Sequence, residues 1–209
     1  MKHEWRKKEK HLYFPKEKPE IIDIPEMQYI SIKGQGNPNS PIFVDYLQAM
    51  YSVAYTIKMR LKHAEKQPKN YTDWTVYPLE GIWDITEEAK KNFNGKINKD
   101  DLVFELMIRQ PDFISPEIFK EKKDLAFQKK GFDLIQQVEL KKITEGKCIQ
   151  MLHIGSFDNE PATFAIMEDF AKASHVVRQS KLHREIYLSD FKKIPEHRLK
   201  TVLRIQLES

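Results

Sequence analysis

Apolar residues recur along the chain at two spacings, and each spacing predicts a different kind of element. From Phe43 to Leu61 they fall three or four positions apart, which places them on one face of an α-helix. Ser40 and Pro41 precede this stretch and are typical of a helix start, because a proline at the first helical position loses no hydrogen bond. The same spacing predicts a second helix over residues 161–174. Its inward positions are Phe164, Met167, Phe170 and Ala171.

Alternation of apolar and polar residues predicts strands, because successive side chains of a strand point to opposite faces. The predicted strands lie at residues 24–32, 75–85, 101–109, 143–151, 182–189 and 200–207. A further helix is expected over residues 116–130, where Ser115 serves as the cap, Pro116 opens the helix and Gly131 ends it.

The chain contains an internal repeat, which bears on the whole fold. Residues 24–36 align with residues 143–155 without a gap, so that Gly36 meets Gly155. The closing strands of the two parts also match in their apolar positions. Each part therefore follows the order strand, helix, strand, strand.

These elements predict an α+β fold with two pseudo-symmetric βαββ halves, whose antiparallel sheets surround a central ligand cleft. The halves cover about residues 21–110 and 132–209 of one domain, residues 21–209, and the helix at 116–130 bridges them. Residues 1–20 are charged and aromatic by turns, and we expect them to form an arm packed on that domain.

Strand alternation also assigns faces in the first half. In residues 101–109 the face that carries Phe104 is apolar and is assigned to the helix. Met107 and Arg109 then fall on the opposite face, together with Glu105.

The strand at residues 182–189 places a carboxylate in its middle. The face with Ile186 is assigned to the helix, which leaves His183, Glu185 and Tyr187 on the opposite face. A mid-strand carboxylate two residues from a tyrosine is unusual, yet strands of one-sided sheets commonly carry solvated residues. The pattern alone therefore favours a solvated Glu185.

Composition narrows the classes of function. The net charge is +4 and the basic residues are scattered apart from a short N-terminal run, so we expect no nucleic-acid partner. The single cysteine, Cys148, excludes an internal disulfide and fits a reducing compartment. No apolar run approaches the roughly 18 residues that span a bilayer, and no secretory signal is visible. We expect a cytoplasmic protein without a membrane partner.

Motifs for cofactors and nucleophiles are missing from the sequence. The histidines show no H-x-x-x-H or H-E-x-x-H spacing, and no phosphate-binding glycine pattern or G-x-S-x-G motif occurs. His153 shares its strand face with Ile149 and Met151, so we expect a hydrogen-bonded core histidine, and we expect Cys148 to be structural. The sequence predicts neither a metal nor an organic cofactor.

Two segments carry a resemblance to a known family. Residues 77–83, Tyr-Pro-Leu-Glu-Gly-Ile-Trp, resemble the P-L-E-G-x-W signature of the GyrI-like small-molecule-binding family. Residues 182–190 resemble that family's H-x-E-I-Y-L-S-D strand. Residues 150–155, 158–161 and 195–205 fit the family as well. Several motifs in order, from Ile24 to the C-terminus, make the resemblance specific.

The resemblance implies a ligand cleft between two βαββ halves, in agreement with the repeat. It also implies that Glu185 lies inside this cleft and faces cationic or aromatic ligands, which favours an enclosed Glu185 over a solvated one. The aromatic walls are then expected from Trp83, Tyr55, Tyr187 and Trp74. The further ligand contacts are expected from Glu80, Met107, Arg109 and His183.

One free-standing branch of the family opens the cyclopropane of DNA-alkylating cyclopropanoids, and the chain is similar to that branch. This similarity implies a protein that binds and detoxifies hydrophobic or aromatic xenobiotics by hydrolysis. Glu185 would deprotonate a water molecule, while Tyr187 or Arg109 donates to the carbonyl oxygen that gains charge. Two alternatives stay open: a binder that sequesters drugs without catalysis, and a protein that interacts with DNA gyrase.

Overall fold

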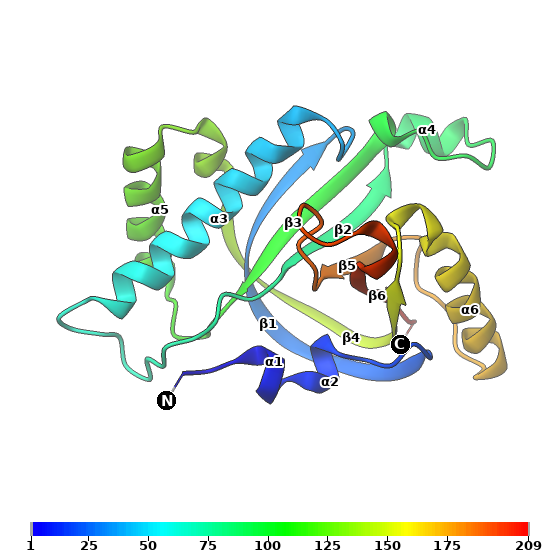
Figure 1. Ribbon diagram of the computed structural model, residues 1–209, viewed down its shortest axis with the longest axis horizontal. Coiled ribbons are helices and arrows are strands. Elements are labelled where there is room, and N and C mark those ends of the chain that lie inside the picture. The colour runs from blue at the N-terminus through cyan, green and yellow to red at the C-terminus, as the bar shows by residue number, and fades with distance from the viewer. Residues whose placement is uncertain (1, 209) are drawn as a thin grey trace. The chain divides into compact units, whose positions relative to one another are not determined.

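The computed structural model describes residues 2–208, which divide into two compact units (Figure 1). The first unit comprises residues 2–4, 27–77 and 84–143. The second unit comprises Trp5–Glu26, Pro78–Trp83 and residues 144–208. The units therefore differ from the two halves of the sequence, because two early segments pack with the C-terminal residues.

Every predicted strand is present among the described residues. The strands are β1 (Glu20–Gln35), β2 (Leu79–Ile85), β3 (Leu102–Gln110), β4 (Glu139–Ile154), β5 (His183–Tyr187) and β6 (Lys200–Gln206). The order strand, helix, strand, strand holds in each half of the sequence, which confirms the α+β class. The pseudo-symmetric relation of the halves and the central cleft stay predictions.

The three predicted helices are also present, and within residues 2–208 three short α-helices and four short 3-10 helices accompany them. The α-helices are α1 (Trp5–Lys8), α2 (Lys10–Tyr13), α3 (Pro41–Lys62), α4 (Glu87–Lys91), α5 (Pro116–Lys130) and α6 (Glu160–Ala173). At α5 the Ser115 hydroxyl accepts from the Ile118 N–H at 3.3 Å, and Gly131 ends the helix with a φ of 69°. The helices of four or five residues were not predicted, because they are too short to show a helical period. No helix among the described residues combines the length and the apolar character that crossing a membrane requires.

In the first unit β1 pairs antiparallel with β3. Phe104 of β3 lies under α3, where its ring meets the edges of Phe43 and Tyr46 at centroid distances of 5.2 Å each. The prediction that the Phe104 face turns toward the helix is confirmed. Met50 and Ile57 on the same helix are fully buried, so α3 contributes much of the apolar core of this unit.

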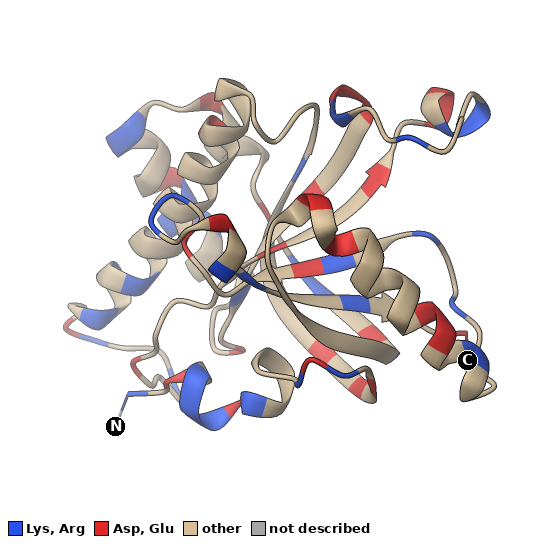
Figure 2. Ribbon diagram, turned by 45° about the vertical axis from the view of Figure 1, so that its right-hand side comes forward, with Lys and Arg blue, Asp and Glu red and all other residues tan. Residues whose placement is uncertain are grey.

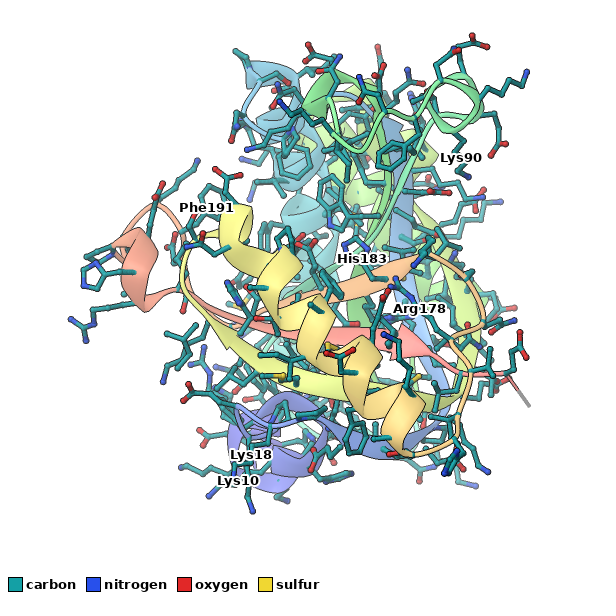
Figure 3. All side chains as sticks on the ribbon, turned by 90° about the vertical axis from the view of Figure 1, so that its right-hand side faces the viewer. Lys10, Lys18, Lys90, Arg178, His183 and Phe191 are labelled. Carbon is teal, nitrogen blue, oxygen red and sulfur yellow. The ribbon has the colours of Figure 1, made fainter. Side chains whose placement is uncertain are left out.

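The second unit holds an antiparallel sheet in the order β2, β5, β6, β4. Helix α6 lies over one face of this sheet (Figures 1 and 3). The cluster between them is apolar and contains Ile149, Met151, Met167, Ala171, Leu203, Ile205 and Leu207, with Phe164 and Phe170 packed against it. The predicted inward positions of α6 are thereby confirmed.

The face assignment of β5 was wrong. Glu185 pairs directly with Leu203, and directly opposed residues of two strands point to the same face. Because Leu203 belongs to the apolar cluster under α6, the face of Glu185 is the helix-covered face. Ile186 shares the opposite face with Arg184, whose charge is neutralised by ion pairs. An arginine buried in this way does not show in the hydrophobic pattern.

Candidate functional site

Four side chains of β2 and β5 form a continuous hydrogen-bonded chain in the second unit. The Trp83 indole N–H donates to the Tyr187 hydroxyl at 2.7 Å, and this hydroxyl donates to Oε2 of Glu185 at 2.8 Å. Nε2 of His183 donates to Oε1 of Glu185 at 3.0 Å. We call Trp83, His183, Glu185 and Tyr187 the Glu185 network. Each oxygen of the carboxylate thus has a fixed partner, which sets its orientation.

Gly81 makes room for this arrangement. It lies directly opposite Glu185 in the β2–β5 ladder, and the Trp83 indole folds back over it. A Cβ at position 81 would lie 2.7 Å from Nε1 of Trp83 and 3.1 Å from the Tyr187 hydroxyl oxygen, which is too close for both. The absence of a side chain at Gly81 is therefore what lets the indole N–H reach Tyr187.

A second carboxyl group approaches from helix α6. Glu160, the first residue of that helix, is only 5% exposed and lies within hydrogen-bonding reach of Glu185. Two carboxyl groups can share a hydrogen bond only when one of them holds a proton. Burial, followed by the charge and hydrogen bond of Glu185, raises the pKa of Glu160 well above its ordinary value. At neutral pH Glu160 therefore holds a proton.

Aromatic rings from outside the strands enclose the network. The Phe164 ring of α6 meets the His183 ring edge-on at a centroid distance of 4.7 Å. Phe157 meets the Tyr187 ring edge-on at 5.8 Å. Glu185 itself is 8% exposed, while the side chain of His183 is 22% exposed. The network is mostly buried and reaches the surface beside the histidine, which Figure 3 shows on β5 close to α6.

Low solvent exposure also holds the Tyr187 phenol in its neutral form. Burial and the neighbouring charge of Glu185 raise the pKa of Tyr187 well above its usual value. The phenol is thus a hydrogen-bond donor over the whole physiological range. Among the described residues, no group of three or more His, Cys, Asp or Glu side chains is arranged to hold a metal ion.

Comparisons with known proteins identify the family of the chain. Residues 17–208 match the model of the GyrI-like small molecule binding domain. The chain belongs to the GyrI-like family. Two crystal structures of a hydrolase from Listeria innocua are 34% and 35% identical to it, with TM-scores of 0.87 and 0.88. The alignments cover 99% and 100% of this chain and all of the Listeria chains.

A more distant structure supports the fold alone. The C-terminal domain of EcmrR is 10% identical to this GyrI-like chain, with a TM-score of 0.51 over 95% of this chain and 99% of that domain. No curated protein matches the chain significantly.

Glu80, which the sequence proposed as a ligand contact, lies on the other face of the GyrI-like sheet. It pairs with Ile186, is 1% exposed and accepts from the Arg184 guanidinium at 2.7 Å. Glu145 bridges Arg184 and Arg204 at 2.9 and 3.0 Å. Burial raises the pKa of Glu80, and the charges of the two arginines oppose this shift. The structure thus places Glu80 in a buried ion-pair cluster and outside the Glu185 network.

The N-terminal segment of the second unit covers part of this ion-pair cluster. Arg204 donates to the backbone carbonyl of Leu12 and to the side chain of Gln150, both at 3.0 Å. Gln150 in turn donates to the carbonyl of His11 at 2.7 Å. Two strands of the sheet are thereby hydrogen-bonded to α2.

The other predicted ligand residues belong to the first unit. Trp74 is 2% exposed and packs against Tyr71, Phe113 and Lys58. Tyr55 is 52% exposed on α3, and Met107 is fully buried. The Arg109 guanidinium lies over the Tyr77 ring at 4.8 Å. Their role in binding stays a prediction, whereas Trp83, His183, Glu185 and Tyr187 are brought together within one unit.

Sequence reasoning missed two contributors to this site. Glu160 was interpreted only as part of a motif at the start of a helix. An acidic residue at the N-terminal end of a helix is common and by itself does not indicate catalysis. Its pairing with Glu185 depends on how α6 packs on the sheet, which no local pattern records. Phe157 was missed for the same reason. His153, by contrast, is the predicted core histidine, with Thr163 Oγ1 at 2.8 Å and the Ser156 carbonyl at 3.0 Å.

Proposed function

We propose that this GyrI-like protein binds apolar, aromatic xenobiotics at the Glu185 network and detoxifies them by hydrolysing a strained ring, as in DNA-alkylating cyclopropanoids. The observation that carries the proposal is the buried carboxylate of Glu185, held in a fixed orientation by Tyr187 and His183. The family assignment supports small-molecule binding, and the similar Listeria innocua protein is a hydrolase.

Glu185 is suited to act as a general base. Its environment excludes most water, so a single water molecule bound beside it would be held in place rather than exchanged with bulk solvent. The carboxylate would take a proton from that water while the oxygen attacks the strained ring. General bases positioned in this way contribute typically 10²–10⁴-fold to a rate.

The aromatic side chains are suited to hold the ligand. Trp83, Tyr187, Phe157 and Phe164 lie around the carboxylate on the α6 side of the sheet. Stacked or edge-on contacts with a flat ligand contribute about 0.5–1.5 kcal/mol each beyond the burial of apolar area. A polyaromatic ligand would gain from several such contacts at once.

Mass spectrometry tests the proposal directly. Purified protein is incubated with a cyclopropanoid, and the expected product is the substrate plus one water. The Glu185→Gln variant should lose this conversion, because the amide cannot accept the proton. Glu196→Gln serves as the matched control, since Glu196 is an exposed glutamate of the same unit.

The other outcomes identify the alternatives. Intact ligand that co-elutes with the wild-type protein contradicts hydrolysis and favours sequestration. Recovery of DNA gyrase in a pull-down, without binding of the small molecule, contradicts both and favours a protein partner.

A further inference from the structure

Glu160 has an oxygen that the fold leaves without a partner. Oε1 of Glu160 is buried, and no described backbone or side-chain group donates a hydrogen bond to it. Most buried side-chain oxygens are satisfied, and an unsatisfied one in a native fold calls for an explanation. This oxygen belongs to the same carboxyl group that lies within hydrogen-bonding reach of Glu185.

The partners of the two carboxyl groups decide where their common proton resides. Glu185 accepts from both Tyr187 and His183, and both hydrogen bonds stabilise its charged form. Glu160 is faced by acidic groups, namely Glu185 and Asp158, and by the neutral phenol of Tyr187. The proton therefore resides on Glu160, and Glu185 is the carboxylate.

We propose that Glu160 is a second catalytic residue of this site. It acts as a general acid and protonates the substrate atom that receives the electron pair of the broken bond. This inference rests on the hydrolysis proposed above and assigns its missing proton donor. In the resting geometry the Tyr187 hydrogen is directed at Glu185, so the phenol orients the base. The His183 Nε2–H is likewise directed at Glu185, and the carboxylic acid of Glu160 is the third proton carrier in contact with that carboxylate.

The two glutamates balance the reaction between them. Glu185 takes one proton from the attacking water, and the water oxygen forms a bond to a ring carbon. The strained carbon–carbon bond breaks, and its electron pair moves through the conjugated system to the carbonyl oxygen. Glu160 gives its proton to that oxygen. The proton on Glu185 then passes to Glu160 across their hydrogen bond, which restores the starting pair.

This division of labour defines the substrate class. The pair suits uncharged electrophiles whose ring opening places the electron pair on an oxygen that must be protonated. A product oxygen that is a weak base carries the negative charge stably without a proton. Substrates that yield such an oxygen therefore depend least on the acid. The sensitivity of a substrate to loss of Glu160 should therefore fall as the acidity of its product phenol rises.

Kinetics of Glu160→Gln test the assignment. We expect kcat/KM to fall about 100-fold on a cyclopropanoid that yields a weakly acidic phenol, and less on an analogue that yields a more acidic one. The wild-type rate should decline at alkaline pH as the acid loses its proton, and the variant should lack this decline. Glu196→Gln should keep both the rate and the pH profile of the wild type.

An infrared measurement tests the proton itself, independently of activity. The wild-type protein at neutral pH should show the carbonyl band of a protonated carboxylic acid, which Glu160→Gln should remove and Glu196→Gln should retain. Absence of this band from the wild type overturns the assignment.

The two proposals fail in different ways. If the wild type hydrolyses the substrate and Glu160→Gln keeps its rate and alkaline decline, the role of Glu160 is overturned while the proposed function stands. If the wild type does not hydrolyse the substrate, the proposed function fails together with the catalytic role of Glu160. The infrared band then still decides whether Glu160 holds the proton.

Discussion

At the scale of single residues, the candidate site depends on short contacts between neighbouring side chains. The Trp83 indole, the Tyr187 hydroxyl and the Glu185 carboxylate follow one another at 2.7 and 2.8 Å. Gly81 lies beneath the first of these contacts. Small changes of volume at this point should therefore be costly, because overpacking a tight site forces side chains out of their preferred rotamers.

We predict that Gly81→Ala destabilises the protein by about 1–3 kcal/mol and moves the Trp83 indole off Tyr187. Trp83→Phe removes the part of the ring that the new methyl group would meet, so the alanine should cost less in the Trp83→Phe background. Urea unfolding of the two single variants and the double variant measures this coupling. Additive free energies of unfolding would show that Gly81 and Trp83 do not share the space assigned to them.

A second prediction concerns the single cysteine. Cys148 is fully buried in β4, and burial, with a smaller effect of the Glu145 charge, raises the pKa of its thiol to about 12. The thiolate is the reactive form, so a disulfide reagent should modify the native protein about 1,000-fold or more slowly than the urea-unfolded chain. Fast, stoichiometric labelling of the native protein would contradict the structural role.

Several of these residues could be predicted from the sequence and others could not. Glu185, Tyr187, His183 and Trp83 lie in two strand motifs, and strand pairing alone brings such motifs side by side. Glu160 and Phe157 reach the site only through the packing of α6 and the turn before it. Contacts of that kind depend on tertiary structure and have no period or spacing in the sequence.

At the scale of elements, the sheet of the second unit separates two kinds of polar cluster. The α6 side carries the Glu185 network, and the opposite side carries the ion pairs of Arg184 and Arg204. The wrong face assignment of β5 came from this opposite side, since buried arginines alternate with apolar residues much as solvated ones do. The types and approximate positions of the elements were predictable, whereas the ends of β1 and β4 and the helix-covered face of β5 were not.

We predict that Arg204→Met loosens the N-terminal segment of the second unit. The variant loses the hydrogen bonds to Leu12 and Gln150 and leaves Glu145 with Arg184 alone. Loss of one member of a buried ion pair costs about 3–5 kcal/mol. Hydrogen–deuterium exchange should speed up in residues 5–16, and urea unfolding should report the lost stability.

Arg178→Met provides the control for this variant. Arg178 pairs with Glu168 at 3.0 Å and donates to the carbonyls of Lys181 and Leu182. Its loss should speed up exchange in residues 178–182 and leave the N-terminal segment as protected as in the wild type. Equal exchange of residues 5–16 in both variants would contradict the link through Arg204.

At the scale of the whole molecule, the acidic and basic residues are interspersed along the helices and strands (Figure 2). Most of these charges are solvated, and their contributions to stability are small. The exceptions are the buried groups, whose protonation links the stability of the entire chain to pH.

We predict that Glu160 lowers the stability of the protein as the pH rises. Its pKa in the folded state is raised, so between the ordinary value near 4.5 and the raised value the folded state holds a proton that the unfolded state has released. The free energy of unfolding should then fall with pH by up to about 1.4 kcal/mol per unit. This fall should be largely absent in Glu160→Gln.

Urea unfolding from pH 5 to pH 9 provides the measurement. The free energy of unfolding of the wild type minus that of Glu160→Gln should fall steadily as the pH rises. Parallel curves for the two proteins would mean that Glu160 is not protonated preferentially in the folded state.

The pairing of β2 with β5 has a consequence for how the protein is made. Trp83 and Tyr187 are 104 positions apart, so the ribosome synthesises β2 long before it synthesises β5. A nascent chain must therefore keep β2 unpaired with β5 until nearly the whole polypeptide has left the ribosome. Such late, long-range closure is slow and exposes strand edges to aggregation. Slow or chaperone-assisted folding, rather than low final stability, is the expected limit on the yield of active protein.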